Sequence, residues 1–435
     1  MKASDGTTVS IEAASGLERR MRVQVPAEHI DSAVDERLRR VGRKVKLKGF
    51  RPGKVPMKVV RQRYGGSVRR EVIGEVMQAS FTDAVERERL RPAGGPRIEP
   101  NSVEAGKDLA YTATFEVYPE IELQGLEGIT VVRPIAEVGE SDVDDMLENL
   151  RHQNADWRDV ARPAQEGDQV VIDYVGRIEG VAFEGGAGEA VAIVLGEGRM
   201  LPDLEQGLIG INAGEKRSVP VNFPSDYPSK ELVGKAAEFH VEARAVKERM
   251  LPELDETFCA RFGVTEGGLE RLRGEVAENM QRELDSRVRA RVRRQVLDGL
   301  LAANPLQLPI APVEDEVRSL QEDSLNRMGI SDRSRLPPPE PFREQARRRV
   351  ALGLLIGKLV EEQGIELDPA NVRERLEELA ADYQDPAAMT RSMRANPQVM
   401  QGIESAVLEQ QVVEWLLERA NVTETSMTFK DIMGI

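Results

Sequence analysis

Several residue types are scarce in this 435-residue sequence, and each shortage excludes a class of chemistry. The single cysteine, Cys259, excludes a disulfide within the chain and fits a reducing compartment. Three scattered histidines, His29, His152 and His240, provide no basis for a histidine metal site or a histidine triad. Aromatic residues make up only 4% of the chain, so we expect aliphatic cores, in which a cluster of Phe and Tyr is informative.

Long apolar runs are also missing. No stretch approaches the about eighteen consecutive apolar residues of a membrane-spanning helix, and the first six residues lack the apolar core of a signal peptide. We therefore expect a cytoplasmic protein of bacterial type with no membrane contact. A chain of this length exceeds one compact core, which predicts two to four domains.

The sequence does contain a concentrated basic segment, Arg37 to Arg63, with twelve Lys or Arg residues and no Asp or Glu. The whole protein is acidic, with 60 basic and 75 acidic residues and a net charge of −15. Up to Tyr118 we count 23 basic and 16 acidic residues, a net charge of +7, which leaves 37 basic and 59 acidic residues and a net charge of −22 for the remainder. One end of the chain is therefore suited to meet a polyanion and the rest is not.

The first 118 residues have the spacing of a small α+β domain. Alternation and helical periodicity predict a hairpin of strands near 9–11 and 21–25, a helix over 30–45, a short helix after Pro56, a longer helix over 68–85 and a strand over 109–117. Gly49 and Pro52-Gly53 should end the first helix, because both residue types break helical geometry. The basic segment then occupies the tip of a helix–loop–helix that projects from the sheet.

The rest of the chain changes composition twice. Residues 119–156 predict a connector that packs with the helical body. Residues 157–248 predict a compact β-rich domain, because ten of the 39 residues from Gly176 to Gly214 are glycine. Residues 249–435 predict an elongated all-α domain. With the small domain of residues 1–118, the predicted fold class is an α+β multidomain protein.

A long apolar repeat marks the start of the helical domain. Apolar residues recur every four positions from Leu272 to Leu300 without a break. At 100° per residue, a spacing of four advances the stripe by about 40° at each step, so it winds most of the way round the helix. Such a helix cannot bury one fixed face against one partner and should meet different neighbours along its length.

The centre of the basic segment runs Gly49-Phe50-Arg51-Pro52-Gly53-Lys54-Val55-Pro56, a loop shaped by Gly and Pro with an aromatic residue beside an arginine. Charge alone favours a solvated helix face. The pattern Gly-Phe-Arg-x-Gly-x-x-Pro, continued by Gln62-Arg63-Tyr64-Gly65, resembles the ribosome-binding signature of the bacterial trigger factor family. The residues that this resemblance assigns to ribosome binding are Gly49, Phe50, Arg51, Pro52, Gly53, Lys54 and Pro56. Pro52 departs from the lysine that is common in the family.

Five short motifs in the β-rich segment resemble an FK506-binding-protein-type (FKBP-type) prolyl isomerase, among them Val171-Ile172-Asp173-Tyr174-Val175-Gly176 and Leu195-Gly196-Glu197-Gly198-Arg199-Met200-Leu201-Pro202. The resemblance implies an apolar pocket whose walls are Tyr174, Phe183, Leu201, Phe223, Tyr227 and Phe239. It also implies that the Leu201 N–H is a hydrogen-bond donor to the substrate, and that Asp173 and Glu184 lie at the rim. Some of these side chains are alternatively explained as the core of a small barrel.

Two positions depart from the isomerase pattern. Val191 and Leu204 stand where typical pockets have aromatic residues, Leu204 at the floor. Rotation of a prolyl amide crosses a barrier of about 18–20 kcal/mol because resonance is lost, and an apolar pocket with one main-chain donor lowers it without a nucleophile, metal or other cofactor. We therefore expect isomerase activity that is present, reduced on short peptides, and independent of cofactors.

The resemblance covers the whole chain. It implies an ATP-independent chaperone that docks on the large ribosomal subunit near the nascent-chain exit, holds nascent and unfolded polypeptides, and catalyses prolyl isomerisation. A homodimer of the free protein is left open. Two rivals are a dedicated prolyl isomerase with substrate-recruiting domains and an RNA-binding protein that uses the 37–63 patch alone. The absence of a Gly-x-x-x-x-Gly-Lys-Ser/Thr loop argues against an ATP-driven cycle.

Overall fold

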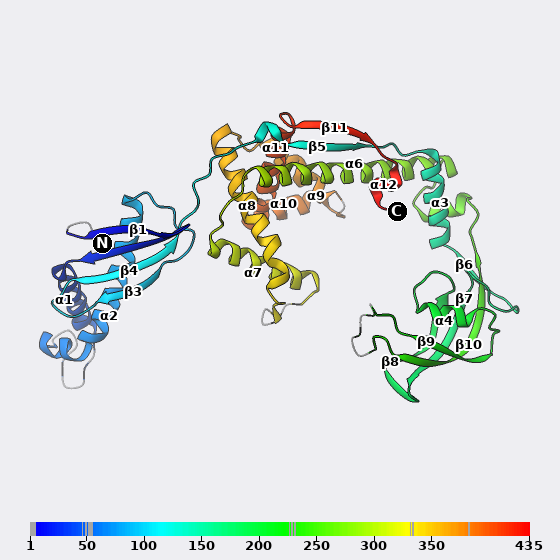
Figure 1. The fold of residues 1–435 in the computed structure, drawn as a ribbon, viewed down its shortest axis with the longest axis horizontal. Helices are drawn as coiled ribbons and strands as arrows, with labels where there is room; N and C mark the ends of the chain where they lie inside the picture. The colour runs from blue at the N-terminus through cyan, green and yellow to red at the C-terminus, as the bar shows by residue number, and fades with distance from the viewer. Residues whose placement is uncertain are drawn as a thin grey trace. The chain divides into compact units, whose positions relative to one another are not determined.

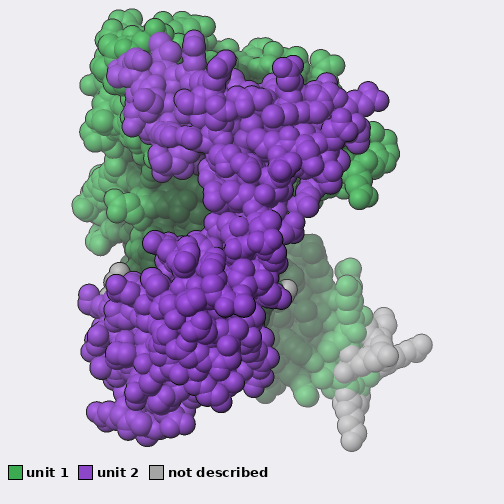
Figure 2. Space-filling view, turned by 90° about the vertical axis from the view of Figure 1, so that its right-hand side faces the viewer, with its two compact units in different colours: residues 1–133, 290–424 green, residues 134–289, 425–435 purple. Residues whose placement is uncertain are grey.

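The computed structural model of the protein describes residues 6–45, 47, 50, 55–225, 227, 229, 232–330, 332, 335–381 and 383–435. It divides into two compact units, each of which combines segments that are distant in the sequence (Figure 2). Unit 1 comprises residues 1–133 and 290–424, and unit 2 comprises residues 134–289 and 425–435. None of the helices in these described ranges is both long and apolar enough to cross a membrane.

The N-terminal part of unit 1 is a four-stranded antiparallel sheet with two helices (Figure 1). The sheet order is β1-β2-β4-β3, with bounds β1 Thr8–Ser15, β2 Glu18–Val25, β3 Arg97–Ser102 and β4 Leu109–Glu116. The helices α1 Ala27–Lys44 and α2 Met57–Arg87 pack on this sheet, and the alternate residues of β4 from Leu109 to Phe115 are all buried in the shared core. The hairpin, the first helix and the last strand agree with the sequence-based prediction.

Helix α2 differs from the prediction of a short helix followed by a longer one. It is continuous over 31 residues and runs through Gly65 and Gly66. Each glycine inside a helix costs about 1 kcal/mol relative to alanine. Val60, Val68 and Val72 are buried on one face of the helix, so packing against the sheet offsets this cost.

The β-rich part of unit 2 is a five-stranded antiparallel sheet, and one short helix packs in its hydrophobic core. Its order is β6-β10-β7-β8 with β9 paired to β10, and its elements are β6 Asp156–Asp159, β7 Gln169–Ile178, β8 Val181–Val194, α4 Pro202–Leu208, β9 Lys216–Asn222 and β10 Ala236–Met250. Leu204 and Leu208 of α4 are fully buried against the sheet. The predicted β-rich domain is therefore present in the middle of the chain.

The remaining elements are mainly helical. They are the 3-10 turn Leu126–Gly128, β5 Thr130–Ile135, α3 Glu140–Gln153, α5 Glu256–Arg261, α6 Gly268–Ala303, α7 Ile310–Arg327, α8 Glu340–Gln363, α9 Pro369–Ala380, α10 Pro386–Ala395, α11 Pro397–Leu417, β11 Asn421–Ser426 and α12 Phe429–Met433. Strand β11 lies in a region predicted to be all helical. It forms because β5, about 290 residues earlier, supplies a pairing edge that no local pattern indicates (Figure 1).

The apolar stripe of α6 meets different neighbours along its length, as predicted. From Leu272 to Leu284 it packs in one core with side chains of α3, α5 and α12, all within unit 2. In the half that belongs to unit 1, Val296 and Leu300 are fully buried, and the Gln295 amide exchanges hydrogen bonds of 2.9 and 2.8 Å with the main chain of Val132. Successive turns of one helix thus serve separate cores.

Candidate functional site

A bulge in β8 lies beside the aromatic cavity of the β-rich domain. Val175 of β7 pairs with Ala187, and Arg177, two residues further on, pairs with Ala182, so four residues of β8, 183–186, lie opposite the single residue Gly176. A Cβ on Gly176 would lie 2.9 Å from ring carbons of both Phe183 and Phe239. The absence of a side chain at Gly176 therefore lets these two rings close over the strand.

The aromatic side chains form one connected cluster. The ring centroids are 5.8 Å apart for Tyr174–Phe239, 6.1 Å for Phe239–Phe183, 5.9 Å for Phe183–Phe223 and 4.8 Å for Phe223–Tyr227. All four pairs meet tilted or edge to face, which aromatic rings prefer to a flat sandwich. Because aromatic residues are scarce in this chain, five of them in one cluster identify a specialised apolar surface.

This cluster borders a cavity of about 470 Å³. The lining residues are Tyr174, Phe183, Glu184, Gly185, Arg199, Met200, Leu201, Pro202, Leu204, Phe223, Tyr227, Ser229, Leu232 and Phe239. The structure thus brings together eight of the ten residues that the sequence predicts for the pocket. Leu204 is fully buried and forms part of the lining, so the floor is aliphatic.

Asp173 and Val191 do not line this cavity. Neighbouring residues of a strand point to opposite faces, so Asp173 is directed away from the face that Tyr174 serves. Its carboxylate accepts hydrogen bonds from the Ala190 N–H at 2.8 Å and from Arg244 Nε at 2.7 Å. The Ala190 N–H, followed by Arg244, holds the pKa of Asp173 below its ordinary value. Val191 is half-buried against the core of the domain instead.

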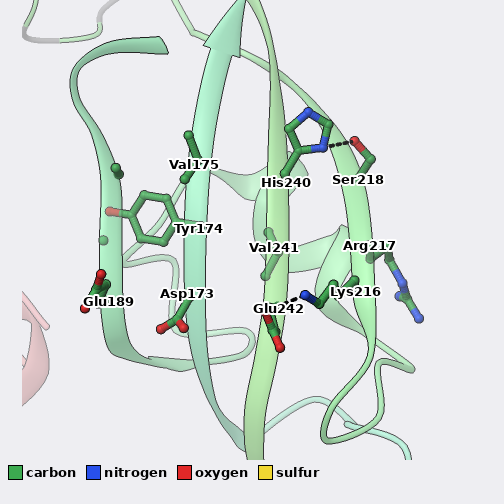
Figure 3. Close-up of a pocket in the computed structure, with 12 residues that line it drawn as sticks. Asp173, Tyr174, Val175, Glu189, Lys216, Arg217, Ser218, His240, Val241 and Glu242 are labelled. Atoms are coloured by element: carbon green, nitrogen blue, oxygen red, sulfur yellow. Dashed lines mark hydrogen bonds and ion pairs between the residues drawn. The ribbon is translucent and has the colours of Figure 1, made fainter.

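A second hollow of about 510 Å³ lies on the side of the sheet to which Asp173, His240 and Glu242 point (Figure 3). Several of its polar groups already have partners. The Ser218 hydroxyl donates to Glu238 at 2.7 Å and lies 3.0 Å from His240 Nδ1, while Lys216 forms an ion pair with Glu242 at 3.0 Å. Because its one hydroxyl proton goes to Glu238, Ser218 is not presented to His240 as a nucleophile.

The loop before α4 presents the main-chain donor that the resemblance implies. Leu201 caps the helix, and its carbonyl accepts hydrogen bonds from the N–H groups of Leu204 and Glu205 at 2.9 and 3.1 Å. Within the described part of the chain, the Leu201 N–H has no acceptor, and the residue lines the cavity. A main-chain donor without a described acceptor therefore belongs to a residue that lines the apolar pocket.

Sequence reasoning missed Glu205, whose carboxylate is buried behind this loop. It is 7% exposed and accepts hydrogen bonds from the N–H groups of Gly196, Gly198 and Met200 at 3.1, 3.3 and 3.0 Å. The available signal was an acidic residue in the first turn of a helix directly after a Gly-x-Gly loop. The main-chain donors of such a loop need an acceptor.

In the folded protein, acidic side chains from outside the basic segment form ion pairs with some of its arginines. Arg37 pairs with Glu75 at 2.5 Å, and Arg61 pairs with Asp35 at 2.5 Å, so carboxylates from flanking parts of α1 and α2 neutralise some of the cations. The hydrogen bond that Arg37 donates to the Glu75 carboxylate raises the pKa of Arg37. The cations of this segment that form no ion pair with any described residue are Arg39, Arg43, Lys44, Lys58 and Arg63.

The centre of the tip lies largely outside the described residues. This applies to Gly49, Arg51, Pro52, Gly53 and Lys54. Phe50 is described: its side chain is 39% exposed, and its N–H donates to the Leu47 carbonyl at 3.0 Å. Pro56 immediately precedes α2, and its carbonyl accepts the first hydrogen bonds of that helix from Val59 and Val60. Phe50, an apolar residue of the basic segment, is thus partly exposed to solvent.

Leu204→Trp tests the aliphatic floor. A ring at this position would offer a proline a flat surface, so we expect peptide isomerase activity to rise several-fold at a stability cost of about 1–3 kcal/mol from overpacking. Protease-coupled assays on a proline tetrapeptide measure the rate, and calorimetry measures the cost. A folded variant no faster than the parent would remove Leu204 from the floor of the working site.

Comparisons with known proteins identify the family. The models described as bacterial trigger factor protein and its C-terminus match residues 7–150 and 268–418, and the model of FKBP-type peptidyl-prolyl cis-trans isomerase matches residues 160–244. The chain is 48% identical over 426 residues to the trigger factor of Thioalkalivibrio sulfidiphilus, which covers 98% of both chains. It is 47% identical over 423 residues to that of Azotobacter vinelandii, which covers 97% of both chains. The family and the isomerase domain predicted from the sequence are therefore confirmed, and the chain belongs to the trigger factor family of chaperones with an FKBP-type prolyl isomerase domain.

Proposed function

We propose that the tip around Phe50 docks this chaperone on the large ribosomal subunit near the nascent-chain exit, in the cytoplasm. The observation that supports this proposal best is an exposed aromatic residue in a sequence segment that keeps five described cations without ion pairs to described residues. Ribosomal RNA is a polyanion, so cations supply salt-sensitive attraction, and a central aromatic residue supplies an anchor. Docking would bring the chaperone to the site where nascent chains emerge.

Phe50→Ala combined with Arg51→Ala tests this docking. We expect at least about a tenfold loss of ribosome association, because anchor residues of this kind contribute about 2 kcal/mol or more. Co-sedimentation with ribosomes across a salt series measures the association, and binding by the parent should weaken as salt rises. Isomerase activity should stay unchanged, because its residues lie in the other unit.

The matched control is Arg97→Ala combined with Val103→Ala. This pair also removes an exposed arginine and an exposed apolar side chain of the same sheet domain, 81% and 44% exposed, but away from the tip. Equal ribosome binding by the tip variant and this control would refute the tip assignment. Equally tight binding of the parent to naked ribosomal RNA would favour the RNA-binding alternative instead.

In the isomerase domain, we propose that substrate proline enters the aromatic cavity. The walls withdraw water from the amide, and since hydration favours the planar, charge-separated form, dehydration lowers the barrier to rotation. The Leu201 N–H then donates to the carbonyl oxygen of the rotated amide. Glu184 at the cavity edge is assigned to the rim. Asp173 is proposed to support the strand through Arg244, and Val191 to pack against the core of the domain.

The helical body is proposed to hold nascent and unfolded chains through scattered apolar side chains. Met393 and Met400 are half-buried beside the small core of α9 and α11, while Leu379 and Tyr383 are exposed nearby, 38% and 50%. Flexible methionines suit a surface that accepts varied sequences. The division into domains 1–118, 119–156, 157–248 and 249–435, and a homodimer of the free protein, remain proposals, which limited proteolysis and analytical ultracentrifugation respectively would test.

A further inference from the structure

We infer that Glu205 is a positioning residue for prolyl isomerisation: its buried carboxylate fixes the direction in which the Leu201 N–H points. This inference rests on the proposed role of that N–H as the donor to the rotating amide. Glu205 itself does not line the cavity. It therefore acts through the loop and not by contact with substrate.

The geometry constrains the main chain on both sides of Leu201. Before it, the Met200 N–H donates to Glu205 Oε1 at 3.0 Å. After it, the Leu201 carbonyl accepts from the N–H of Glu205 at 3.1 Å. Glu205 thus binds the peptide groups on both sides of the Leu201 N–H: its carboxylate binds the Met200 N–H, and its own N–H binds the Leu201 carbonyl. With both neighbours fixed, the orientation of the N–H between them is fixed as well, in a residue that lines the cavity.

The other carboxylate oxygen stabilises the start of the same loop. Glu205 Oε2 accepts from the N–H groups of Gly196 and Gly198 at 3.1 and 3.3 Å. These glycines have φ angles of +91° and +66°, a conformation that side chains disfavour, so the loop depends on an acceptor at its centre to hold this shape. A carboxylate that is 7% exposed and satisfied by three main-chain donors is a specific arrangement, because buried charges are otherwise costly.

Glutamine and alanine at position 205 should give graded effects. Glutamine keeps one oxygen for the paired glycine donors but turns an NH₂ group toward the Met200 N–H, so the contact nearest to Leu201 is lost. We expect Glu205→Gln to lower kcat about tenfold and Glu205→Ala to lower it further. The aromatic walls remain, so the affinity for a proline tetrapeptide should change less than about threefold. Glu189→Gln, an exposed carboxylate of β8 in the same domain, is the control and should match the parent.

The experiment uses the full chain and separates positioning from folding. Calorimetric titration with the tetrapeptide gives the number of binding-competent sites, and kcat is expressed per such site. A merely structural role would reduce the number of sites and leave kcat per site unchanged, which would overturn the inference. A parent protein without activity would instead refute the proposed site itself, so the two failures are distinguishable.

Hydrogen exchange of the parent provides a test that needs no variant. The Met200 and Gly198 amides should exchange slowly because Glu205 accepts from them, whereas the Leu201 amide should exchange faster. Addition of the tetrapeptide should slow the Leu201 amide selectively, because the substrate carbonyl becomes its acceptor. Exchange of Met200 as fast as Leu201 in the free protein would also overturn the inference. No effect of the peptide on Leu201 would instead refute the proposed donor role of its N–H.

Discussion

Phe239→Ala is expected to remove most of the isomerase activity and to destabilise the domain by about 3–5 kcal/mol. The ring is only 4% exposed and contacts both Tyr174 and Phe183 in the aromatic cluster. Its strand position places it between Gly176 and Val219, so removal leaves a cavity that neighbouring main chain cannot fill. We expect kcat/KM on a proline tetrapeptide to fall by at least about tenfold, as measured by a protease-coupled assay.

A matched substitution at position 239 distinguishes the effect of the aromatic ring from the effect of the side-chain volume. Phe239→Leu keeps most of the apolar volume and should cost less stability, yet it removes the flat wall and should still reduce activity. Val181→Ala, at a side chain that is 70% exposed in the same sheet, should leave both properties unchanged. Ribosome co-sedimentation should be the same for all three variants. Full activity in a folded Phe239→Ala protein would show that the cavity is not where proline binds.

Arg162→Met is expected to destabilise the same domain by about 3 kcal/mol. Asp168 is 4% exposed, and its carboxylate accepts two hydrogen bonds from Arg162, at 2.5 and 3.0 Å, and one from the Gln165 N–H at 2.9 Å. Removal of the arginine leaves a buried charge with one remaining donor, which is costly because the desolvation of that charge is no longer offset. Arg158→Met is the control, because that arginine is largely exposed in its pair with Glu248, and we expect it to cost less than about 1 kcal/mol.

The stability lost through Arg162→Met should become smaller at low pH. Burial by itself would raise the pKa of Asp168, but the hydrogen bonds from Arg162 and from the Gln165 N–H outweigh it and hold the pKa below the ordinary value of 3.8. A carboxyl with a lowered pKa in the folded state stabilises the fold above its unfolded-state value, and this contribution is lost as the pH falls through the folded-state pKa. The parent should therefore exceed the variant in stability by a constant amount near neutral pH, and the difference should shrink below about pH 4.

Unfolding free energies of parent and variant between pH 3 and 7 measure this difference. Other carboxyl groups titrate over the same range in both proteins, so they largely cancel in the comparison. Asp168→Asn added to Arg162→Met should restore part of the stability at neutral pH, because the unpaired charge is gone. A difference that is independent of pH would mean that Arg162 stabilises the domain by packing alone.

The sequence by itself determined the order of the α+β, β-rich and helical parts along the chain and most of the residues that line the pocket. Local alternation and helical spacing are short-range signals, and they place Tyr174 and Phe239 on core-facing strand positions and mark the winding stripe of α6. Gly176 was recognisable only as part of a motif. The structure gives the reason for it, since a Cβ there would meet two rings of the cluster. The same alternation, applied to Asp173, would have placed its side chain on the opposite face from Tyr174.

Only the tertiary structure decided which distant groups meet. The acid-free basic segment acquires Glu75 and Asp35 as partners because two helices pack side by side, and β11 exists because β5 lies beside it. The burial of Glu205 and its three main-chain donors are likewise decided by the fold, because the sequence shows only an acidic residue after a Gly-x-Gly loop, one of 75 acidic residues. Burial, the bulge in β8 and the closure of a loop depend on contacts between residues far apart in the chain. Such contacts form only once the loop-closure entropy has been overcome, and no local pattern encodes them.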